Sequence, residues 1–148
     1  MQVSENGVLA VGTKCFSIPV RVYYEDTDAG GIVYHATYLR FLERARTDWL
    51  RHVGFHHQRL ANEFGVQFVV QSLQINFRKP ARLDELLEAT VGIESLGYCR
   101  VVFRQSIERD GETLTRATVS AACLELGTSR PVAMPMALRD CLQRAEGA

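Results

Sequence analysis

The sequence lacks several features that would point directly to a function. Lys and Arg together number 17 and Asp and Glu together number 17 in 148 residues, so no net charge favours nucleic acid or an acidic membrane surface. No apolar run approaches the roughly 20 residues of a membrane span. The amino terminus has no basic region of the kind that begins an export signal. We therefore expect a cytoplasmic protein that neither binds nucleic acid nor inserts into a membrane.

Cysteine is scarce and scattered. The four cysteines, Cys15, Cys99, Cys123 and Cys141, form no C-x-x-C pair. Cys99 and Cys123 lie in apolar runs typical of strands, which favours buried, reduced thiols over a disulfide framework. Internal repeats and low-complexity linkers are also absent. We expect a loose amino-terminal arm over residues 1–14 and a single domain over residues 15–148.

The familiar catalytic and metal-binding motifs are missing. The sequence has no G-x-S-x-G, no Walker loop, no G-x-G-x-x-G and no H-E-x-x-H. A calcium loop that begins at Asp26 would place Thr37 at its twelfth position, where the bidentate Glu is needed. His52 and His56 are four residues apart, but Gly54 interrupts the helix that a metal pair would need, so a solvated basic cluster is favoured. We expect no metal and no cofactor.

The apolar periodicity predicts one long helix and a set of strands. Apolar residues alternate over 16–24, which is typical of a half-buried strand, and Pro19 indicates that the start of this strand lies at an edge or outside the ladder. Helical spacing over 35–53 predicts the central helix, which ends at Gly54. The other elements are expected to be a short helix over 56–64, strands over 66–78, 87–94, 101–110 and 113–126, and a terminal helix over 136–144.

The order of these elements predicts the fold class. One strand, one long helix and four further strands with mostly short connections fit an α+β fold, in which a five-stranded antiparallel sheet curls around one long central helix. Asp110-Gly111 is a strong signal for a two-residue hairpin. Such a sheet leaves an open edge, and we therefore expect a second copy of the chain to cover an edge or the outer face.

The stretch from Tyr23 to His35 concentrates the residues with chemical potential. Glu25, Asp26 and Asp28 precede the pair Gly30-Gly31 and the predicted helix start. Asp28 beside the first helical amides would stay ionised, as a nucleophile or general base, while those amides polarise a carbonyl group. A second interpretation is equally open: Asp26 or Asp28 can simply cap a turn. His35 can orient a substrate, shuttle a proton or hydrogen-bond the loop.

Two stretches carry a resemblance to a known family. Residues 22–39, V-Y-Y-E-D-T-D-A-G-G-I-V-Y-H-A-T-Y-L, and residues 41–47, F-L-E-R-A-R-T, resemble the hotdog-fold thioesterases of the 4-hydroxybenzoyl-CoA thioesterase superfamily. Within it they are similar to the acyl-CoA thioesterases associated with the bacterial Tol–Pal system. Residues 80–84, P-A-R-L-D, match a second recurrent stretch of the same group. His35 stands where the benzoyl-CoA branch has an aromatic residue, which favours the Tol–Pal subgroup.

The resemblance implies a hotdog fold and hydrolysis of acyl-CoA. It makes Asp28 the catalytic carboxylate and implies that the helix-start amides near His35 polarise the thioester carbonyl. We take His35 as a second candidate catalytic residue, and Tyr34 and Gly31 as candidates for oxyanion stabilisation or substrate positioning. Coenzyme A then enters as part of the substrate rather than as a cofactor. Arg78, Lys79 and Arg82 can contact its phosphates, although an ordinary solvated charge run is an equal alternative.

The resemblance also implies partners and competing functions. Family dimers place the active sites at the subunit interface and often pair again, so we expect a homodimer or a homotetramer. An acyl-carrier protein is a possible donor besides coenzyme A. A hotdog hydratase needs His or Asn five residues after the Asp, where this chain has Val33. The remaining alternative is an acyl-thioester or envelope-complex binding module without turnover.

Overall fold

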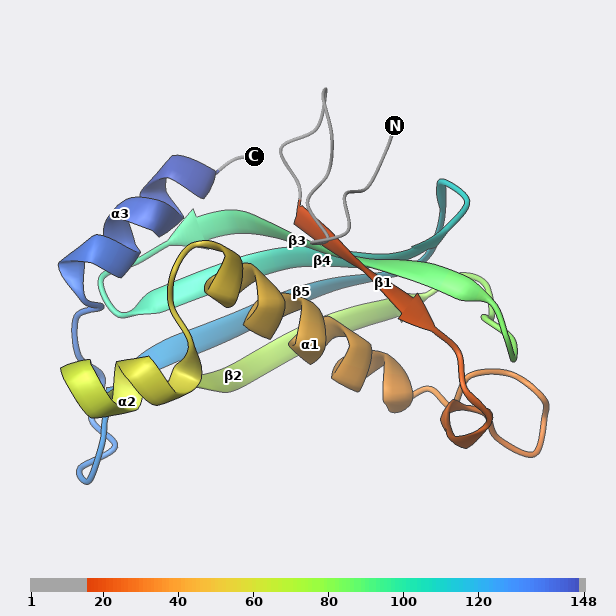
Figure 1. Ribbon diagram of the computed structural model, residues 1–148, viewed down its shortest axis with the longest axis horizontal. Helices are drawn as coiled ribbons and strands as arrows, with labels where there is room; N and C mark the ends of the chain where they lie inside the picture. Colours follow the sequence, from red (N-terminus) through yellow and green to blue (C-terminus); the bar gives the residue numbers. More distant parts are fainter. Residues whose placement is uncertain (1–15, 147–148) are drawn as a thin grey trace.

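The computed structural model describes residues 16–146, so the arm expected over 1–14 and Cys15 lie outside the described residues. One sheet curves around the long helix α1, and two shorter helices lie at one end (Figure 1). The elements in chain order are β1 (Phe16–Arg21), η1 (Tyr24–Asp26), α1 (Thr37–His52), α2 (His57–Phe64), β2 (Val66–Phe77), β3 (Leu86–Leu96), β4 (Arg100–Arg109), β5 (Glu112–Glu125) and α3 (Met136–Ala145). The predicted α+β class and five-stranded antiparallel sheet are confirmed.

Helix α1 is the centre of the core, as its sequence pattern predicts. Its buried side faces the sheet and carries Thr37, Tyr38, Phe41, Leu42, Ala45, Trp49 and Leu50. The helix begins two residues later than expected, because Tyr34 to Ala36 form a turn in which the Thr37 amide donates to the Tyr34 carbonyl at 2.8 Å. We call the end at Thr37 the near end of α1 and the end at His52 the far end.

The strands lie in the order β1-β3-β4-β5-β2, with every neighbouring pair antiparallel. The expected sequential pairing of the last strands is confirmed, and the β4–β5 hairpin turns at Asp110 (φ 51°) and Gly111 (φ 82°). Strand β1 is an edge strand, as Pro19 predicts. It stops at Arg21 rather than at Tyr24, however, because the chain then enters the 3₁₀ turn η1, where Tyr24 is 82 % exposed.

Strand β2 lies at the other edge of the sheet and contains a β-bulge. Val70 pairs with Ala121 and Ser72 pairs with Ser120, so Gln71 is an extra residue in β2. Since side chains alternate between the faces of a strand, this insertion lets Val70 and Leu73 lie on the same face of the sheet. The helix does not cover that face completely at the edge. Val70 and Leu73 are each 41 % exposed and Phe77 is 49 % exposed.

The described cysteines and helices match two further expectations from the sequence. Cys99, Cys123 and Cys141 are free thiols; Cys123 is fully buried and the other two are half-buried. Between residues 16 and 146, no helix is long and apolar enough to cross a membrane.

Candidate functional site

The acidic stretch folds into a small closed hairpin at the near end of α1. Thr27 bridges Val33, and the Asp28 amide donates to the Ile32 carbonyl at 2.9 Å. The Tyr34 amide donates to the Asp26 carbonyl, also at 2.9 Å. These bonds fix the turn that carries Asp28 against the residues that lead into the helix.

Asp26 and Asp28 both cap turns, but they differ in exposure. Asp26 is buried, and its Oδ2 accepts a hydrogen bond from the Tyr23 amide at 2.8 Å. Asp28 is exposed; its Oδ1 accepts from the Gly30 amide at 2.8 Å, and its Oδ2 has no partner among the described residues. A Cβ atom at Gly30 would lie 3.1 Å from Asp28 Oδ1, so the glycine lets backbone and carboxylate approach closely. Asp28 is therefore the exposed aspartate of the pair, and its Oδ2 is free to meet a substrate or a water molecule.

The amides available at the helix start are not those of Tyr34 and Gly31. The Tyr34 amide is engaged with Asp26, and the Gly31 amide donates to the Asp28 carbonyl at 3.0 Å. Their assignment to substrate positioning stays a prediction, and in this structure both N–H groups serve the turn. The amides of His35, Ala36 and Tyr38 have no acceptor within residues 16–146. These are the donors that a carbonyl oxygen at the near end could reach.

The second sequence motif clamps this hairpin from the side. The Val33 amide donates to the Ala81 carbonyl at 2.9 Å, and Ile32 forms a bridge with Arg82. The Ala81 amide donates to the buried Tyr38 hydroxyl at 3.1 Å. Burial raises the pKa of Tyr38, so the hydroxyl stays neutral in its role as acceptor. Residues 80–84 thus hold the Asp28 hairpin and the first turn of α1 together.

Aromatic rings form one wall beside the helix start. His35 is exposed and its ring centroid lies 4.5 Å from that of Tyr34 and 6.4 Å from that of Phe77. Phe77 also contacts Tyr38, with centroids 5.5 Å apart. The sequence reasoning missed Phe77. Its signal was a large apolar residue at the very end of a strand, directly before the charged run Arg78-Lys79.

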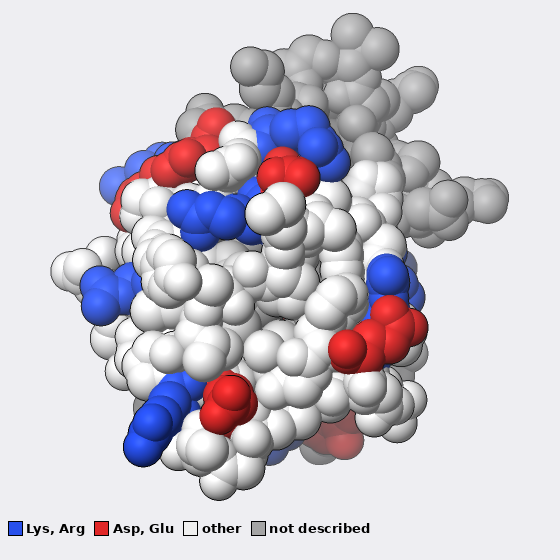
Figure 2. Space-filling model, turned by 90° about the vertical axis from the view of Figure 1, so that its left-hand side faces the viewer, with Lys and Arg blue, Asp and Glu red and all other residues white. Residues whose placement is uncertain are grey.

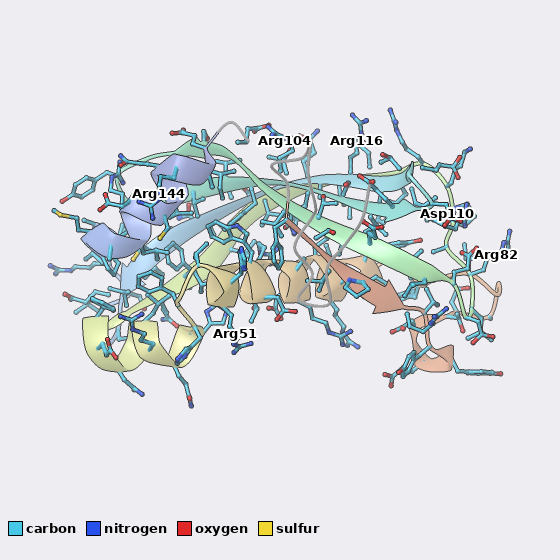
Figure 3. The ribbon with its side chains drawn as sticks, turned by 45° about the horizontal axis from the view of Figure 1, so that its top comes forward. Arg51, Arg82, Arg104, Asp110, Arg116 and Arg144 are labelled. Carbon is cyan, nitrogen blue, oxygen red and sulfur yellow. The ribbon has the colours of Figure 1, made fainter. Side chains whose placement is uncertain are left out.

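The three candidate coenzyme A contacts differ in their availability. Lys79 pairs with Glu112, and Lys79 and then Arg109 lower the pKa of that carboxyl group. The side chains of Arg78 and Arg82 make no hydrogen bond or ion pair with another described residue. Arg82 projects at the near end, beside the Asp28 hairpin (Figure 3). Two of the three cations are therefore free to meet a phosphate.

The histidines near the far end have separate roles. His52 stacks against Phe16 at 5.3 Å, and His56 caps α2 by accepting from the Arg59 amide at 3.1 Å. His57 Nε2 lies 3.1 Å from the hydroxyl of Thr47, which also hydrogen-bonds Glu43. In the part of the chain that the structure describes, no three His, Cys, Asp or Glu side chains gather in a way that could hold a metal ion.

The Asp28 hairpin, the exposed helix-start amides and the clamp of residues 80–84 coincide with a family match. The model of the thioesterase superfamily matches residues 30–116, more than half of the chain. The chain belongs to the thioesterase superfamily.

Relatives and solved structures agree with this membership. This member of the superfamily is 48 % identical over 120 residues to the acyl-CoA thioesterase YbgC of Haemophilus influenzae, covering 81 % of the chain and 88 % of the relative. It is 45 % identical over 129 residues to the acyl-CoA thioester hydrolase YbgC of Escherichia coli O6:H1, covering 86 % and 96 %. The crystal structure of a probable thioesterase from Bartonella henselae aligns with a TM-score of 0.78 at 36 % identity, covering 82 % of this chain and 99 % of that one.

Proposed function

We propose that the protein hydrolyses acyl-CoA thioesters to the free acid and coenzyme A. The observation that carries the proposal is Asp28: its carboxylate is exposed, one oxygen is anchored by the Gly30 amide, and the other has no partner among the described residues. It lies on a turn held against a helix start with unoccupied amides. The names of the relatives, an acyl-CoA thioesterase and an acyl-CoA thioester hydrolase, support the same substrate class.

The chemistry divides between the hairpin and the helix start. The thioester carbonyl oxygen accepts from the free amides near His35, which stabilise the negative charge that develops on it. In one route, Asp28 removes a proton from water, the resulting hydroxide attacks the carbonyl carbon, and the C–S bond breaks as the thiolate takes that proton. In the other route, an Asp28 oxygen attacks the carbonyl carbon, and the C–S bond breaks to release the thiolate and leave a mixed anhydride. Water then hydrolyses this anhydride to the free acid and the Asp28 carboxylate, and the proton released goes to the thiolate. The residues permit both routes.

Charge and exposure indicate where coenzyme A and a second copy of the chain would bind. Arg78 and Arg82 can meet the phosphates of coenzyme A, while Lys79 would first have to leave Glu112. We propose that a second copy pairs with the open edge of β2, which is the last strand of the described sheet. Two such dimers would form the expected tetramer. We place the reaction in the cytoplasm, with an acyl-carrier protein as an alternative donor.

The decisive experiment compares two carboxylate variants. Purified protein is assayed against a panel of acyl-CoA and acyl-carrier-protein thioesters, alongside Asp28→Asn and the control Asp140→Asn, which changes an exposed carboxylate on α3. We expect Asp28→Asn to lose about a hundredfold or more in kcat/KM with an unchanged fold, and Asp140→Asn to match the parent. Full activity in Asp28→Asn would refute its assignment. Absence of turnover on every thioester would favour the binding module instead.

A multiple-turnover reaction in water enriched in heavy oxygen separates the two routes. Direct attack, with water then opening the anhydride at the Asp28 carboxyl carbon, would leave the isotope in the Asp28 carboxylate after repeated turnovers, whereas water activation would place it only in the product acid. Mass spectrometry of the peptide that contains Asp28 is the readout.

A further inference from the structure

A cavity lies under the far half of α1, away from the Asp28 hairpin. It measures about 450 Å³, within the usual range of small-molecule sites. The cavity is lined by the far half of α1, by helices α2 and α3, and by the inner face of β2, β4 and β5. Most of the side chains that line it are apolar, and they include Trp49, Phe68, Val70, Phe103, Ala121 and Leu142.

A strip of apolar side chains connects the candidate catalytic site to this cavity. Phe77, which contacts His35 and Tyr38, is the first residue of the strip, and Leu73 and Val70 follow it along the same face of β2. All three are well exposed, and Val70 also lines the cavity. The β-bulge at Gln71 makes the apolar strip continuous, because without the bulge Val70 and Leu73 would lie on opposite faces of the sheet. An apolar group that leaves the helix start therefore has an apolar surface to follow.

Four of the five polar side chains that line the cavity, those of Glu43, Arg46, Thr47 and His57, are hydrogen-bonded within the protein. Arg46 Nη1 donates to Gln105 Oε1 at 2.9 Å, and the buried Gln105 amide donates to the Leu42 and Thr90 carbonyls at 3.0 and 3.1 Å. Burial lowers the pKa of the half-buried Arg46. At the rim, Thr47 joins Glu43 to His57. These pairings favour an aliphatic occupant over one that carries hydroxyl groups.

Helices α2 and α3 line the far end of the cavity. Leu138 and Leu142 of α3 are 0 % and 2 % exposed and line the cavity, as does Ala61 of α2. Figure 2 looks onto this end of the molecule: the centre of the face is uncharged, and the Lys, Arg, Asp and Glu side chains lie around it. An acyl chain that enters from the near end thus meets apolar side chains, rather than charged ones, at the far end of the cavity.

Helix geometry sets the length of chain that can reach this space. At 1.5 Å per residue, Glu43 and Leu50, the first and last α1 residues that line the cavity, lie about 8 Å and about 18 Å beyond Tyr38. C–C bonds of about 1.5 Å at angles near 111° advance an extended chain by roughly 1.25 Å per carbon. Entering the cavity therefore takes roughly six carbons, and reaching Leu50 takes roughly fourteen.

We propose that this cavity holds the distal part of a medium- or long-chain aliphatic acyl group whose thioester carbonyl lies at the start of α1. The inference rests on the proposed thioesterase function and adds its substrate class. The acyl chain of dodecanoyl-CoA is long enough to extend well into the cavity, whereas that of butanoyl-CoA stops on the strip before reaching it. The side chains at Ala61 and Ala121 then determine acyl selectivity, because each is small and borders the cavity.

The first test fills the cavity and measures selectivity. The ratio of kcat/KM for dodecanoyl-CoA to that for butanoyl-CoA is determined for the parent, Ala61→Phe, Ala121→Phe and the control Ala137→Phe. Ala137 is exposed on α3 and does not line the cavity. We expect the ratio to fall at least about tenfold in the two cavity variants and to stay at the parent value in the control. Ala61 is only half-buried, so Ala61→Phe keeps the test valid if Ala121→Phe does not fold. An unchanged ratio in folded Ala61→Phe would overturn the proposal.

The second test measures binding without turnover. Trp49, the only tryptophan, lines the cavity and reports its occupation by fluorescence. Asp28→Asn protein is titrated with sodium dodecanoate and with sodium butanoate below micelle-forming concentrations. We expect a saturable change in Trp49 emission with dodecanoate, at least about tenfold weaker binding of butanoate, and a loss of at least about tenfold in dodecanoate affinity in Asp28→Asn/Ala61→Phe.

The two proposals fail in different ways. Dodecanoate binding in the cavity together with no hydrolysis of any thioester would refute the proposed function and retain the cavity assignment. Hydrolysis that depends on Asp28, with the same dodecanoyl preference in parent and Ala61→Phe, would retain the function and refute the cavity assignment. Equal changes in Trp49 emission in Asp28→Asn and in Asp28→Asn/Ala61→Phe would refute the cavity assignment as well.

Discussion

The two ends of α1 are built in different ways. At the near end, hydrogen bonds between residues close in sequence hold Asp26 and Asp28 within one exposed hairpin. At the far end, apolar side chains from helices and strands spread over the whole domain enclose a cavity. The difference separates chemistry from selectivity: a short motif can place a carboxylate, whereas a pocket for an acyl chain requires the complete core.

The ends also differ in their contact with water. Cys123 lies near the far end, where it pairs with Phe68 on the neighbouring strand β2. Burial raises the pKa of the Cys123 thiol to about 11. The Asp28 side chain, by contrast, is exposed. A carboxylate that must exchange protons with water gains from exposure, and an acyl chain that must leave water gains from a dry surface.

The largest effect is expected from a change that damages both ends together. Phe41 is fully buried on the side of α1 that faces the sheet, so Phe41→Ala should lower the free energy of unfolding by about 3–5 kcal/mol. Leu39 is 38 % exposed on the same helix, and Leu39→Ala should change it by less than about 1 kcal/mol. Urea denaturation followed by Trp49 fluorescence and by circular dichroism measures both. Two separate transitions in Phe41→Ala would show that the ends do not share one core.

The dry character of the far end can be measured on Cys123. A thiol with a pKa of about 11 instead of the ordinary 9.0 has about a hundredfold less thiolate at pH 8. Alkylation of Cys123 by iodoacetamide should therefore be at least about a hundredfold slower in the folded protein than in urea. Peptide mass spectrometry gives the two rates. Equal rates would mean that water reaches this end freely.

Within the near end, the two aspartates should separate stability from activity. Asp26→Ala removes a buried acceptor from the Tyr23 amide and should lower the free energy of unfolding by about 2 kcal/mol. Asp28→Ala removes an exposed acceptor and should lower it by less than about 1 kcal/mol, while abolishing turnover. Thermal and urea unfolding beside acyl-CoA assays tests this pattern. A larger loss of stability in Asp28→Ala would make it the structural residue of the pair.

The smallest effect is expected where the clamp meets α1. Tyr38→Phe leaves the Ala81 amide without its acceptor and should destabilise the fold by about 1 kcal/mol at pH 7. Because the folded state raises the pKa of Tyr38, its contribution is complete below the unfolded pKa near 10 and is lost as the pH rises through the folded value. The parent should therefore lose stability above pH 10 more steeply than Tyr38→Phe. Identical pH profiles would contradict this.

Sequence patterns were sufficient for the elements whose signals are local. The 3.6-residue spacing of Tyr38, Phe41, Leu42 and Ala45 determined α1 within two residues, since each buried position lies on one face. Asp110-Gly111 gave the β4–β5 turn, because both residues adopt positive φ. The resemblance then selected Asp28 from three neighbouring carboxylates, and its free oxygen is consistent with that choice.

Other features depend on contacts that no local pattern contains. Tyr24 continues the alternation of β1, yet η1 removes it from the sheet because Asp26 accepts from the Tyr23 amide. The amides of Tyr34 and Gly31 are occupied by bonds that form only when the hairpin closes. The cavity requires α2 and α3 to meet the inner face of the sheet, and this depends on side chains more than 70 residues apart, such as Trp49 and Leu142.

The bulge at Gln71 restricts how this chain can diverge. Deleting one residue there would reverse the two faces of residues 72–77, so that Gln74 and Asn76 would face α1 and Leu73 and Phe77 would face outward. Substitutions along β2 can widen or narrow the apolar strip step by step, whereas a single insertion or deletion removes it at once. The length of β2 is therefore under stronger constraint than the identity of any one of its side chains.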